Sequence, residues 1–379
     1  MSNVSDLLAK LVQIESINPN LSPKGSGEAA IAAYVAKFCE GEGIELKLQP
    51  VSEGRSNVLA WVSGTDPDKR VLFESHLDTV PAEGWQRYPF AAERAGRRMY
   101  GRGTCDTKSS LAAMLHALVA IKKEKPRATI FVAGTVDEEY QKIGARALVQ
   151  SGIGFEAAVA GEPTSLEVVV AHKGSVRWWI ETIGRAAHSS KPELGLNAIA
   201  GIAHVIPELV RLGDELRTRY EHSLVGSPSL TISLIQGGSD ICTVPARCEI
   251  FLDRRLVPQE TPTGAIEEVE KILADLREKH RDLQVRSVLP AVEDPPLEDA
   301  TGSRIAEVAA EACRSIAGTG ATFHGAPWGT DASQLQLTGA KCIVLGPGAA
   351  AQAHTIDEYV DLDEVEKATE IYLRMMQNY

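Results

Sequence analysis

The sequence lacks any run of hydrophobic residues long enough to cross a membrane. A membrane-spanning helix needs about 20 uninterrupted apolar residues, whereas the best candidate, residues 198–212, contains a histidine, a proline and two charged residues. The first residues also lack the basic segment and apolar run of a secretory signal peptide. These absences predict a cytoplasmic protein that does not act at a membrane.

Positive charge is in deficit, with 39 lysines and arginines against 51 aspartates and glutamates. The resulting net charge of −12 repels a phosphate backbone or an anionic lipid surface. The six cysteines include no Cys-x-x-Cys pair, which argues against a thiolate zinc site or a redox motif. We therefore expect reduced, mostly buried thiols and no nucleic-acid partner.

The 379 residues have a globular composition, 44% hydrophobic and 24% charged, and at about 100–200 residues per domain they suggest two domains. Strand-like and helix-like patterns alternate in the first and last parts of the chain. This alternation predicts an α/β fold with a mostly parallel sheet flanked by helices. The expected strands cover residues 57–62, 70–74, 129–136, 157–160 and 341–345, and the expected helices cover residues 4–14, 28–40, 109–123, 145–151, 302–316 and 363–377.

The middle of the chain has a different order of elements. Between residues 175 and 288 the pattern reads strand, helix, strand, strand, helix, strand, which is typical of a small ferredoxin-like α+β domain. We therefore expect a discontinuous α/β domain formed by residues 1–173 and 290–379, and an inserted domain formed by residues 174–289.

Histidines and acidic residues follow the expected strands, at the place where ligands bind in open α/β sheets. His76 and Asp78 come after the strand that ends at residue 74, and residues two apart on extended backbone point the same way. His76 could therefore bind a metal ion while Asp78 accepts its other ring N–H and fixes the tautomer. Taken alone, the pattern also fits a hydrogen-bonded surface histidine.

A glycine-containing segment, Gly101 to Lys108, superficially suggests a dinucleotide-binding loop. The fingerprint needs glycine at position 106, and the Asp106 carboxylate would meet a pyrophosphate with like charge. An aspartate on such a turn instead suits a bridging metal ligand, or else caps the helix that follows.

Three further clusters follow expected strands. Asp137-Glu138-Glu139 places neighbouring carboxylates together, and these repel one another unless a cation is present. Glu162 and His354 follow two other strands. The Asp137-Glu138-Glu139 cluster also fits a solvated loop, and each cluster taken alone has a structural explanation, but the repeated placement at strand ends favours one shared site.

These motifs, in this order, resemble those of the M20 metallopeptidase and acylase family. That family includes acetylornithine deacetylase, succinyl-diaminopimelate desuccinylase, aminoacylase and glutamate carboxypeptidase. The resemblance runs from about Leu7 to Val360 and is carried by His76-x-Asp78, Gly101-Arg-Gly-Thr-x-Asp106-x-Lys108, Asp137-Glu138-Glu139, Gly161-Glu162-Pro163, Ala187-His188-Ser189-Ser190, Gly329-Thr330-Asp331 and Ala353-His354.

The resemblance implies a catalytic domain with two zinc ions bridged by Asp106. His76 and Glu162 would complete one metal site, and Glu139 and His354 would complete the other. Co²⁺ or Mn²⁺ could replace Zn²⁺. Two such ions together can polarise a carbonyl group and lower the pKa of a shared water.

The resemblance also implies roles for residues that are not metal ligands. Glu138 would be the general base that takes the proton of the water and delivers it to the leaving amine, and Asp78 would orient His76. From the inserted domain, a lid and dimerisation domain, His188 would reach the active site of a second subunit and stabilise the oxyanion, which requires a homodimer. Arg255 matches an arginine that pairs with a substrate carboxylate, although a surface salt bridge also explains it.

The expected activity is hydrolysis of the amide bond of an N-acyl amino acid, because the segment around His354 looks most like the acetylornithine deacetylase branch. A dipeptidase, carboxypeptidase or desuccinylase of the same family is the alternative, and a non-catalytic metabolite sensor is the alternative outside it. Two departures from the family pattern bear on the substrate. Cys242 stands where asparagine is usual, and Trp328 is bulky enough to narrow the pocket.

Overall fold

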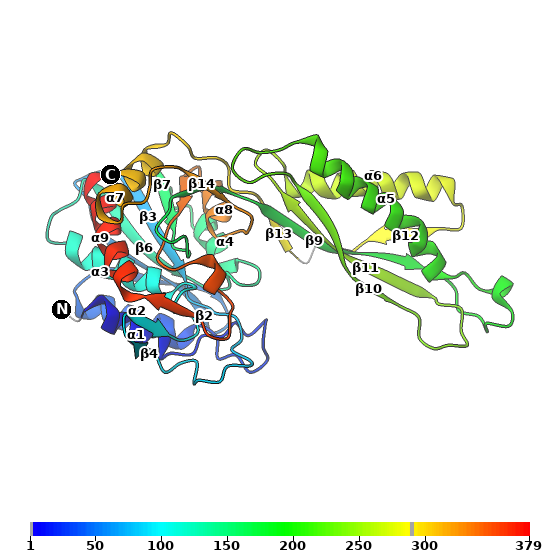
Figure 1. Ribbon diagram of the computed structural model, residues 1–379, viewed down its shortest axis with the longest axis horizontal. Helices are drawn as coiled ribbons and strands as arrows, with labels where there is room; N and C mark the ends of the chain where they lie inside the picture. The colour runs from blue at the N-terminus through cyan, green and yellow to red at the C-terminus, as the bar shows by residue number, and fades with distance from the viewer. Residues whose placement is uncertain (1–2, 289–291) are drawn as a thin grey trace. The chain divides into compact units, whose positions relative to one another are not determined.

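The computed structural model describes residues 3–288 and 292–379, and the chain divides into two compact units (Figure 1). Unit 1 comprises the residues up to Val170 together with Asp299–Gly325 and Thr330–Tyr379, and unit 2 comprises Ala171–Glu298 and Ala326–Gly329. Unit 2 is therefore inserted in the sequence of unit 1. The domain boundary expected between residues 289 and 290 lies outside the described residues.

Unit 1 is built on a sheet that has, among the described residues, eight strands in the order β1-β2-β6-β3-β7-β15-β8-β14. The neighbours β6, β3, β7 and β15 pair in parallel, whereas β1 with β2, β2 with β6 and β15 with β8 pair antiparallel. The strands are β1 (Glu45–Ser52), β2 (Arg55–Val62), β3 (Asp66–His76), β6 (Ala128–Thr135), β7 (Ala157–Ala160), β8 (Val169–His172), β14 (His324–Ala326) and β15 (Lys341–Val344). The predicted α/β class is confirmed.

Helices cover this sheet because their apolar faces need a partner. The helices of unit 1 are α1 (Val4–Val12), α2 (Ala29–Gly41), α3 (Lys108–Ile121), α4 (Ile143–Gln150), α7 (Arg304–Ile316), α8 (Ala332–Leu335) and α9 (Leu362–Asn378). Helix α3 is buried almost all round, since it packs against α1, α9 and the strands β3 and β6. A small sheet of β4 (Glu93–Ala95), β5 (Arg98–Tyr100) and β16 (Tyr359–Asp361) joins distant parts of the chain.

Unit 2 has the predicted split β-α-β-β-α-β order. Its elements are β9 (Gly174–Ile183), α5 (Ala198–Arg219), β10 (Ser229–Gly237), β11 (Arg247–Leu256), α6 (Pro262–Lys279) and β12 (Gln284–Ser287), with β13 (Val292–Asp294) pairing with β9. The strand order is β10-β11-β9-β12, so β10 is an edge strand.

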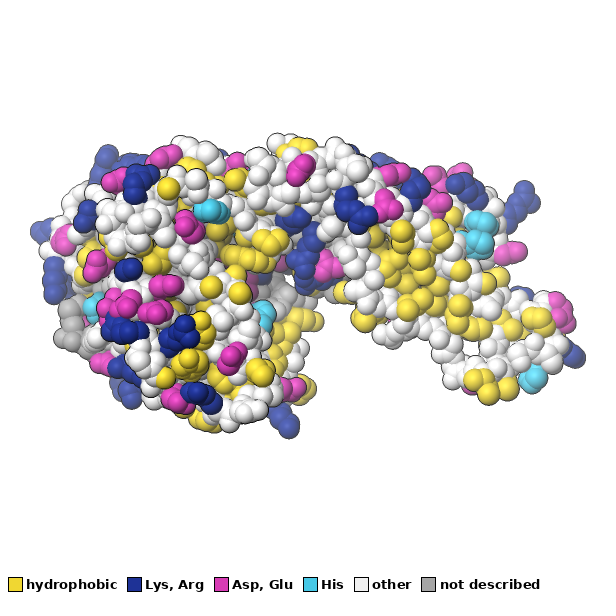
Figure 2. Space-filling model, in the orientation of Figure 1, with side chains coloured by type: hydrophobic (Ala, Val, Ile, Leu, Met, Phe, Trp, Pro, Cys, Tyr) yellow, Lys and Arg dark blue, Asp and Glu magenta, His cyan; other side chains and the backbone are white. Residues whose placement is uncertain are grey.

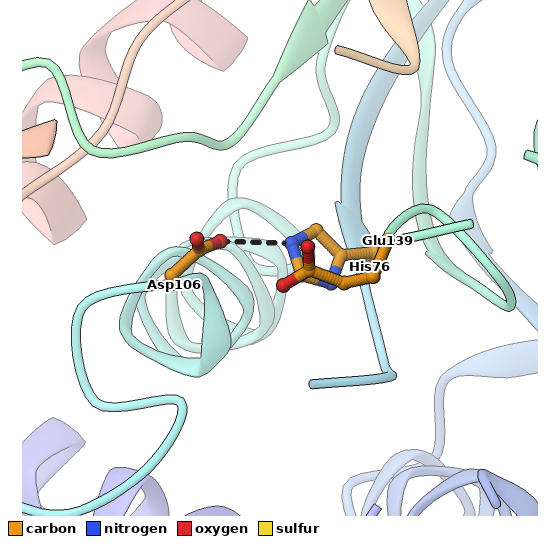
Figure 3. A group of neighbouring side chains, drawn as sticks. All are labelled: His76, Asp106 and Glu139. Atoms are coloured by element: carbon orange, nitrogen blue, oxygen red, sulfur yellow. Dashed lines mark hydrogen bonds and ion pairs between the residues drawn. The ribbon is translucent and has the colours of Figure 1, made fainter. Parts of the chain in front are cut away.

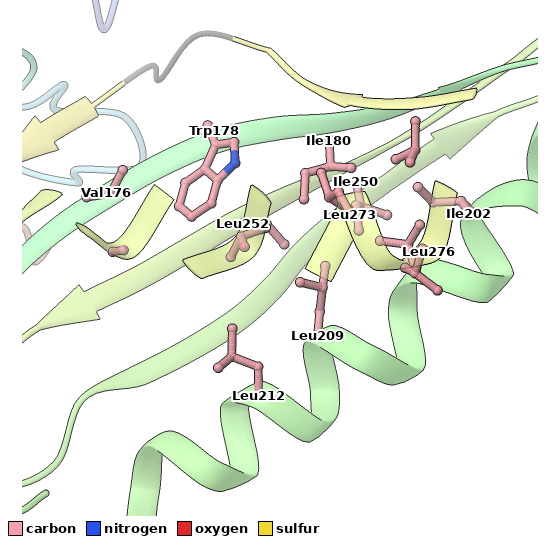
Figure 4. Close-up of a cluster of buried hydrophobic side chains, with 14 of the residues drawn as sticks. Val176, Trp178, Ile180, Ile202, Leu209, Leu212, Ile250, Leu252, Leu273 and Leu276 are labelled. Atoms are coloured by element: carbon pink, nitrogen blue, oxygen red, sulfur yellow. The ribbon is translucent and has the colours of Figure 1, made fainter. Parts of the chain in front are cut away.

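The hydrophobic core of unit 2 lies between the sheet and its two long helices (Figure 4). Alternate residues of β9, such as Trp178 and Ile180, meet Leu209 of α5 and Leu273 of α6 in this core. At about 25 cal/mol per Å² of apolar surface, a layer of this kind supplies the main stabilisation of a small domain.

Neither a membrane-spanning helix nor a disulfide is found among the described residues. In the described part of the chain, no helix is both long and apolar enough to cross a membrane. All six cysteines are free thiols, and five of them are buried, with Cys242 exposed.

Candidate metal centre

The predicted metal-binding residues lie where the parallel strands of unit 1 end. His76, the last residue of β3, pairs in register with Thr135 at the end of β6, and Val344 of β15 pairs with Ala160 at the end of β7. Because the carboxyl ends of parallel strands meet at one edge of the sheet, the loops that follow them converge. These loops carry the carboxylates of residues 137–139 and Glu162.

Asp106 lies between the two predicted histidine ligands. Its Oδ1 is 3.0 Å from Nε2 of His76 (Figure 3), and its Oδ2 is 3.2 Å from Nε2 of His354. His354 Nε2 is also 3.1 Å from Oε2 of Glu139, and His76 Nε2 is 3.8 Å from Oε1 of Glu162. The structure therefore brings all five predicted ligands together, with one carboxylate oxygen of Asp106 facing each imidazole.

This donor set fits a metal centre. Within the described residues, two groups have ligand atoms that all lie within 4.8 Å of one another: His76 with Asp106 and Glu139, and His76 with Glu138 and Glu162. Imidazole nitrogens and carboxylate oxygens are ligands that zinc accepts. Glu138, predicted as the general base, thus has a carboxylate oxygen in the same group as His76 and Glu162.

The carboxyl groups and the histidine of the centre have shifted pKa values. Burial, together with the negative charge of Asp106, raises the pKa of Glu139 to about 7 and the pKa of Glu162 well above its ordinary value. Hydrogen bonds with Asp106 and Glu139 raise the pKa of His354 to about 10. A raised pKa favours the protonated form of each of these groups, and a divalent cation that binds them would compete with their protons.

Asp78 organises the residues around it through both its main chain and its carboxylate. Its main-chain oxygen is 2.9 Å from Nδ1 of His76, closer than its carboxylate oxygen Oδ1 at 3.6 Å. An Nδ1–H donor to this carbonyl leaves Nε2 free to face Asp106 and a metal. The carboxylate instead accepts hydrogen bonds from the backbone N–H groups of Glu138 and Glu139, at 3.0 and 3.2 Å.

A buried ion-pair network behind these residues was not found from the sequence. Arg55 at the start of β2 pairs with Glu28 and, at 2.9 Å, with Asp137. Asn18 donates to Asp78 at 2.7 Å and to Asp137 at 3.0 Å. Arginine and asparagine are ordinary surface residues, so nothing in the local pattern around them signals burial.

Glu358 also has a structural role that the sequence motif did not reveal. This fully buried carboxylate accepts hydrogen bonds from the N–H groups of Gly103, Cys105 and Asp106, at 3.1, 2.8 and 3.1 Å, and from Arg102 at 2.6 Å. It thereby fixes the loop that carries Asp106. In the sequence, the position of Glu358 four residues after His354 is the one feature that could have indicated this role.

The two predicted residues of unit 2 lie in polar surroundings of their own. His188 is exposed, and its Nδ1 is 2.8 Å from the hydroxyl oxygen of Ser190. Arg255 pairs with Asp253, which also binds Arg177 at 2.9 Å. In the structure, Arg255 therefore forms a salt bridge, which is the alternative interpretation of this residue.

Comparison with known proteins agrees with this geometry. The model of peptidase family M20/M25/M40 matches residues 72–378. The acetylornithine deacetylase of Proteus mirabilis is 31% identical over 99% of this chain and 96% of its own length, and that of a Buchnera aphidicola strain is 30% identical over 99% and 97%.

Solved structures show the same fold. A tripeptidase from Staphylococcus aureus superposes with a TM-score of 0.79 at 22% identity, over 99% of this chain and 97% of that one. A metallo-carboxypeptidase from Sulfolobus solfataricus has the same TM-score of 0.79 at 18% identity, over 100% and 99%. A dinuclear metal-binding peptidase from Bacillus subtilis gives 0.74 at 15% identity, over 98% and 96%. The resemblance seen in the sequence is thus confirmed, and the chain belongs to peptidase family M20/M25/M40.

Proposed function

We propose that the protein is a dizinc amidohydrolase that removes the acyl group of an N-acyl amino acid, as an acetylornithine deacetylase does. The observation that carries this proposal is the coincidence of two findings. The relatives of about 30% identity that span nearly the whole chain are acetylornithine deacetylases, and the predicted ligands of a metal centre converge around Asp106. Family membership supports a metal-dependent amide hydrolase, and the choice of zinc and of acyl group is ours.

The ligand set in this proposal is the one expected from the sequence. Asp106 would bridge the two metal sites, His76 and Glu162 would complete the first, and Glu139 and His354 would complete the second. Two metal ions bound in this way would polarise the carbonyl of the scissile amide and make a water molecule more acidic.

Glu138 supplies the proton transfer. Its backbone is held by Asp78 at 3.0 Å, and its carboxylate lies in the same cluster as His76 and Glu162. The carboxylate accepts a proton from the attacking water and passes it to the departing amine nitrogen. We therefore assign acid–base chemistry to the side chain of Glu138.

Unit 2 serves as the lid and dimerisation domain in this scheme. Its edge strand β10 exposes Leu234 (51%) and Ile235 (59%), and α5 exposes Val210 (52%); Figure 2 shows hydrophobic side chains gathered on the visible face of this unit. An unpaired edge strand with apolar side chains is a template for pairing with another strand. We propose a homodimer in which His188 acts at the oxyanion of the second subunit's substrate and Arg255 exchanges Asp253 for a substrate carboxylate.

A substrate panel tests the proposal. The purified, metal-loaded protein is given N-acetylornithine, other N-acetyl amino acids, N-succinyl-diaminopimelate and dipeptides, each with Zn²⁺, Co²⁺ and Mn²⁺. The expected result is fastest release of acetate from an N-acetyl amino acid. Cleavage of dipeptides alone would overturn the deacylase assignment in favour of a peptidase.

The general base has its own test. We expect Glu138→Gln to keep both metals by elemental analysis while kcat falls by about 10²–10⁴, the scale of a lost general base. Glu53→Gln, at an exposed position, is the matched control and should remain fully active. An active Glu138→Gln enzyme would remove this residue from the scheme.

A further inference from the structure

A buried lysine contacts the proposed general base. Lys142 occupies the N-cap of α4 and is 6% exposed. Its Nζ donates to the main-chain oxygen of Glu138 at 3.1 Å and also forms an ion pair with the Glu138 side chain through Oε1. The lysine therefore binds both the backbone and the carboxylate of the same residue.

The backbone of Lys142 is held in an unusual conformation that directs this contact. Its φ of 57° lies in the left-handed region, which residues other than glycine rarely adopt. The N–H of Lys142 donates to the main-chain oxygen of Asp137 at 2.7 Å, and the next turn is closed by Gly144 N–H donating to Val136 at 3.0 Å. The turn after β6 thus reverses the chain direction and brings the side chain of Lys142 next to Glu138.

The surroundings of Lys142 are acidic. The hydroxyl oxygen of Thr135 is 2.6 Å from Oε1 of Glu74 and 2.9 Å from Oδ2 of Asp331, and both carboxyl groups are buried. The positive charge of Lys142 acts on Asp331 by lowering its pKa, against the larger effects of burial and of Glu74 that raise it. The ammonium group therefore acts on the charge of Asp331 and forms its described ion pair with Glu138.

We propose that Lys142 is a positioning residue for Glu138: its ammonium group holds Oε1 and so leaves Oε2 directed to the reacting water. The terminal torsion of a glutamate side chain is soft and has no sharp preferred angle. A charge-assisted hydrogen bond to one oxygen removes that freedom, and proton transfer depends on a fixed donor–acceptor geometry. This inference rests on the proposed role of Glu138 as general base.

A purely structural role is the competing explanation, because an i,i+4 ion pair also closes the turn. The two explanations differ in what a variant loses. A structural lysine affects folding or metal content, whereas a positioning lysine affects kcat with the fold, the metals and KM unchanged.

The experiment compares Lys142→Met with Lys125→Met. Lys125 is the matched control because it is exposed and also has a left-handed φ, of 52°. We expect Lys142→Met to lower kcat by about 10²-fold, as a small misplacement of a reacting group does, with KM within about twofold and full metal content. Lys125→Met should match the parent enzyme.

Chemical rescue separates positioning from folding. In Lys142→Ala, ethylammonium should restore part of kcat in a saturable manner, because it can donate to Glu138 from the vacated space. Tetramethylammonium, which has no N–H, should restore nothing. Equal effects of both ions, a kcat within about twofold of the parent in Lys142→Met, or loss of metal together with kcat would each overturn the proposal.

A melting experiment makes the contact testable without activity. The variants Lys142→Met and Glu138→Gln, alone and combined, are compared by Tm in the metal-loaded protein. We expect the combined loss to be smaller than the sum by about 2 °C or more, since contacting residues are not additive. Additive losses would show that the contact is absent. If the parent protein hydrolyses none of the amides in the panel, the proposed function is wrong. The comparison of single and combined variants still decides whether Lys142 contacts Glu138.

Discussion

At the scale of single residues, the centre depends on side chains that would not touch a metal. Asp106 keeps its position because Glu358 accepts hydrogen bonds from the backbone of the loop before it, including the N–H of Asp106 at 3.1 Å. The same carboxylate pairs with Arg102, and both side chains are buried, at 0% and 3% exposed. Residues that support ligands in this way tune metal affinity.

Replacing Glu358 by glutamine should therefore weaken metal binding. The amide keeps the volume but presents one acceptor oxygen in place of two and leaves Arg102 without a buried countercharge. We expect the metal dissociation constant to rise by about 10–100-fold, measured by competition with a chromogenic chelator. Glu53→Gln is the control, and an unchanged affinity in Glu358→Gln would contradict the supporting role.

Metal binding should also depend on pH. Because Asp106 and Glu139 raise the pKa of His354 to about 10, the imidazole of the metal-free protein is protonated at neutral pH, and the metal must displace that proton. Affinity is therefore expected to fall as the pH is lowered, with protons released into the buffer on binding. Calorimetry in buffers of different ionisation enthalpy measures this release, and binding without proton release would refute it.

At the scale of elements, the turn after β6 holds acidic residues that repel one another. Asp137 has a left-handed φ of 69°, and its carboxylate is held by Arg55 at 2.9 Å, by Asn18 at 3.0 Å and by Asn20 at 3.1 Å. The turn thus places Glu138 and Glu139 at the centre, while Arg55 and the two asparagines bind the carboxylate of Asp137.

Arg55→Met should destabilise unit 1. Removing the arginine leaves the buried carboxylates of Glu28 and Asp137 unpaired, which typically costs about 3–5 kcal/mol of the free energy of unfolding. Urea denaturation of the metal-loaded protein measures the change. Arg127→Met, at an arginine side chain that is 61% exposed, should change stability by less than about 0.5 kcal/mol. A similar effect from both variants would contradict the proposed contribution of the buried network.

The elements themselves were largely predictable because their apolar periodicity is strong. The strands β3, β6, β7 and β15 and the helices α3 and α9 were expected within a few residues of their ends. Strand β1 was missed because it is an edge strand with Pro50 and a mostly exposed pattern. Helix α5 continues to Arg219, beyond the apolar stretch of residues 198–212, since Leu216 still packs into the core of unit 2.

The candidate site was also predictable only in part. The convergence of His76, Glu139 and Glu162 could be predicted, because parallel strands bring their carboxyl ends to one edge whatever the loop details. Arg55, Glu28 and Lys142 could not, because their contacts join segments far apart in the chain or depend on a left-handed turn. Hydrogen-bond partners of this kind leave no periodic pattern in a sequence.

At the scale of the whole molecule, the edge strand β10 gives a test of dimerisation. We expect Ile235→Asp to convert the proposed dimer to a monomer in sedimentation experiments, because a buried unpaired carboxylate opposes strand pairing. The monomer should also have a lower kcat, since His188 is proposed to act on the other subunit. Leu48→Asp is the matched control, at an exposed leucine (45%) on the edge strand β1.

Two outcomes of that experiment would change the scheme. A dimer that persists in Ile235→Asp places the interface elsewhere on the chain. A monomer with full activity removes the need for His188 to act between subunits.

The insertion of unit 2 within the sequence of unit 1 has a consequence for how the protein is made. A ribosome delivers His76, Asp106, Glu139 and Glu162 early, but it delivers His354 and Glu358 only after the whole of unit 2 has been synthesised. On the proposed ligand set, an unfinished chain lacks one imidazole and the carboxylate that shapes the Asp106 loop. Stabilisation by the second metal would therefore be gained only once His354 has been synthesised, so chains that stop before it would be less stable and more exposed to proteolysis.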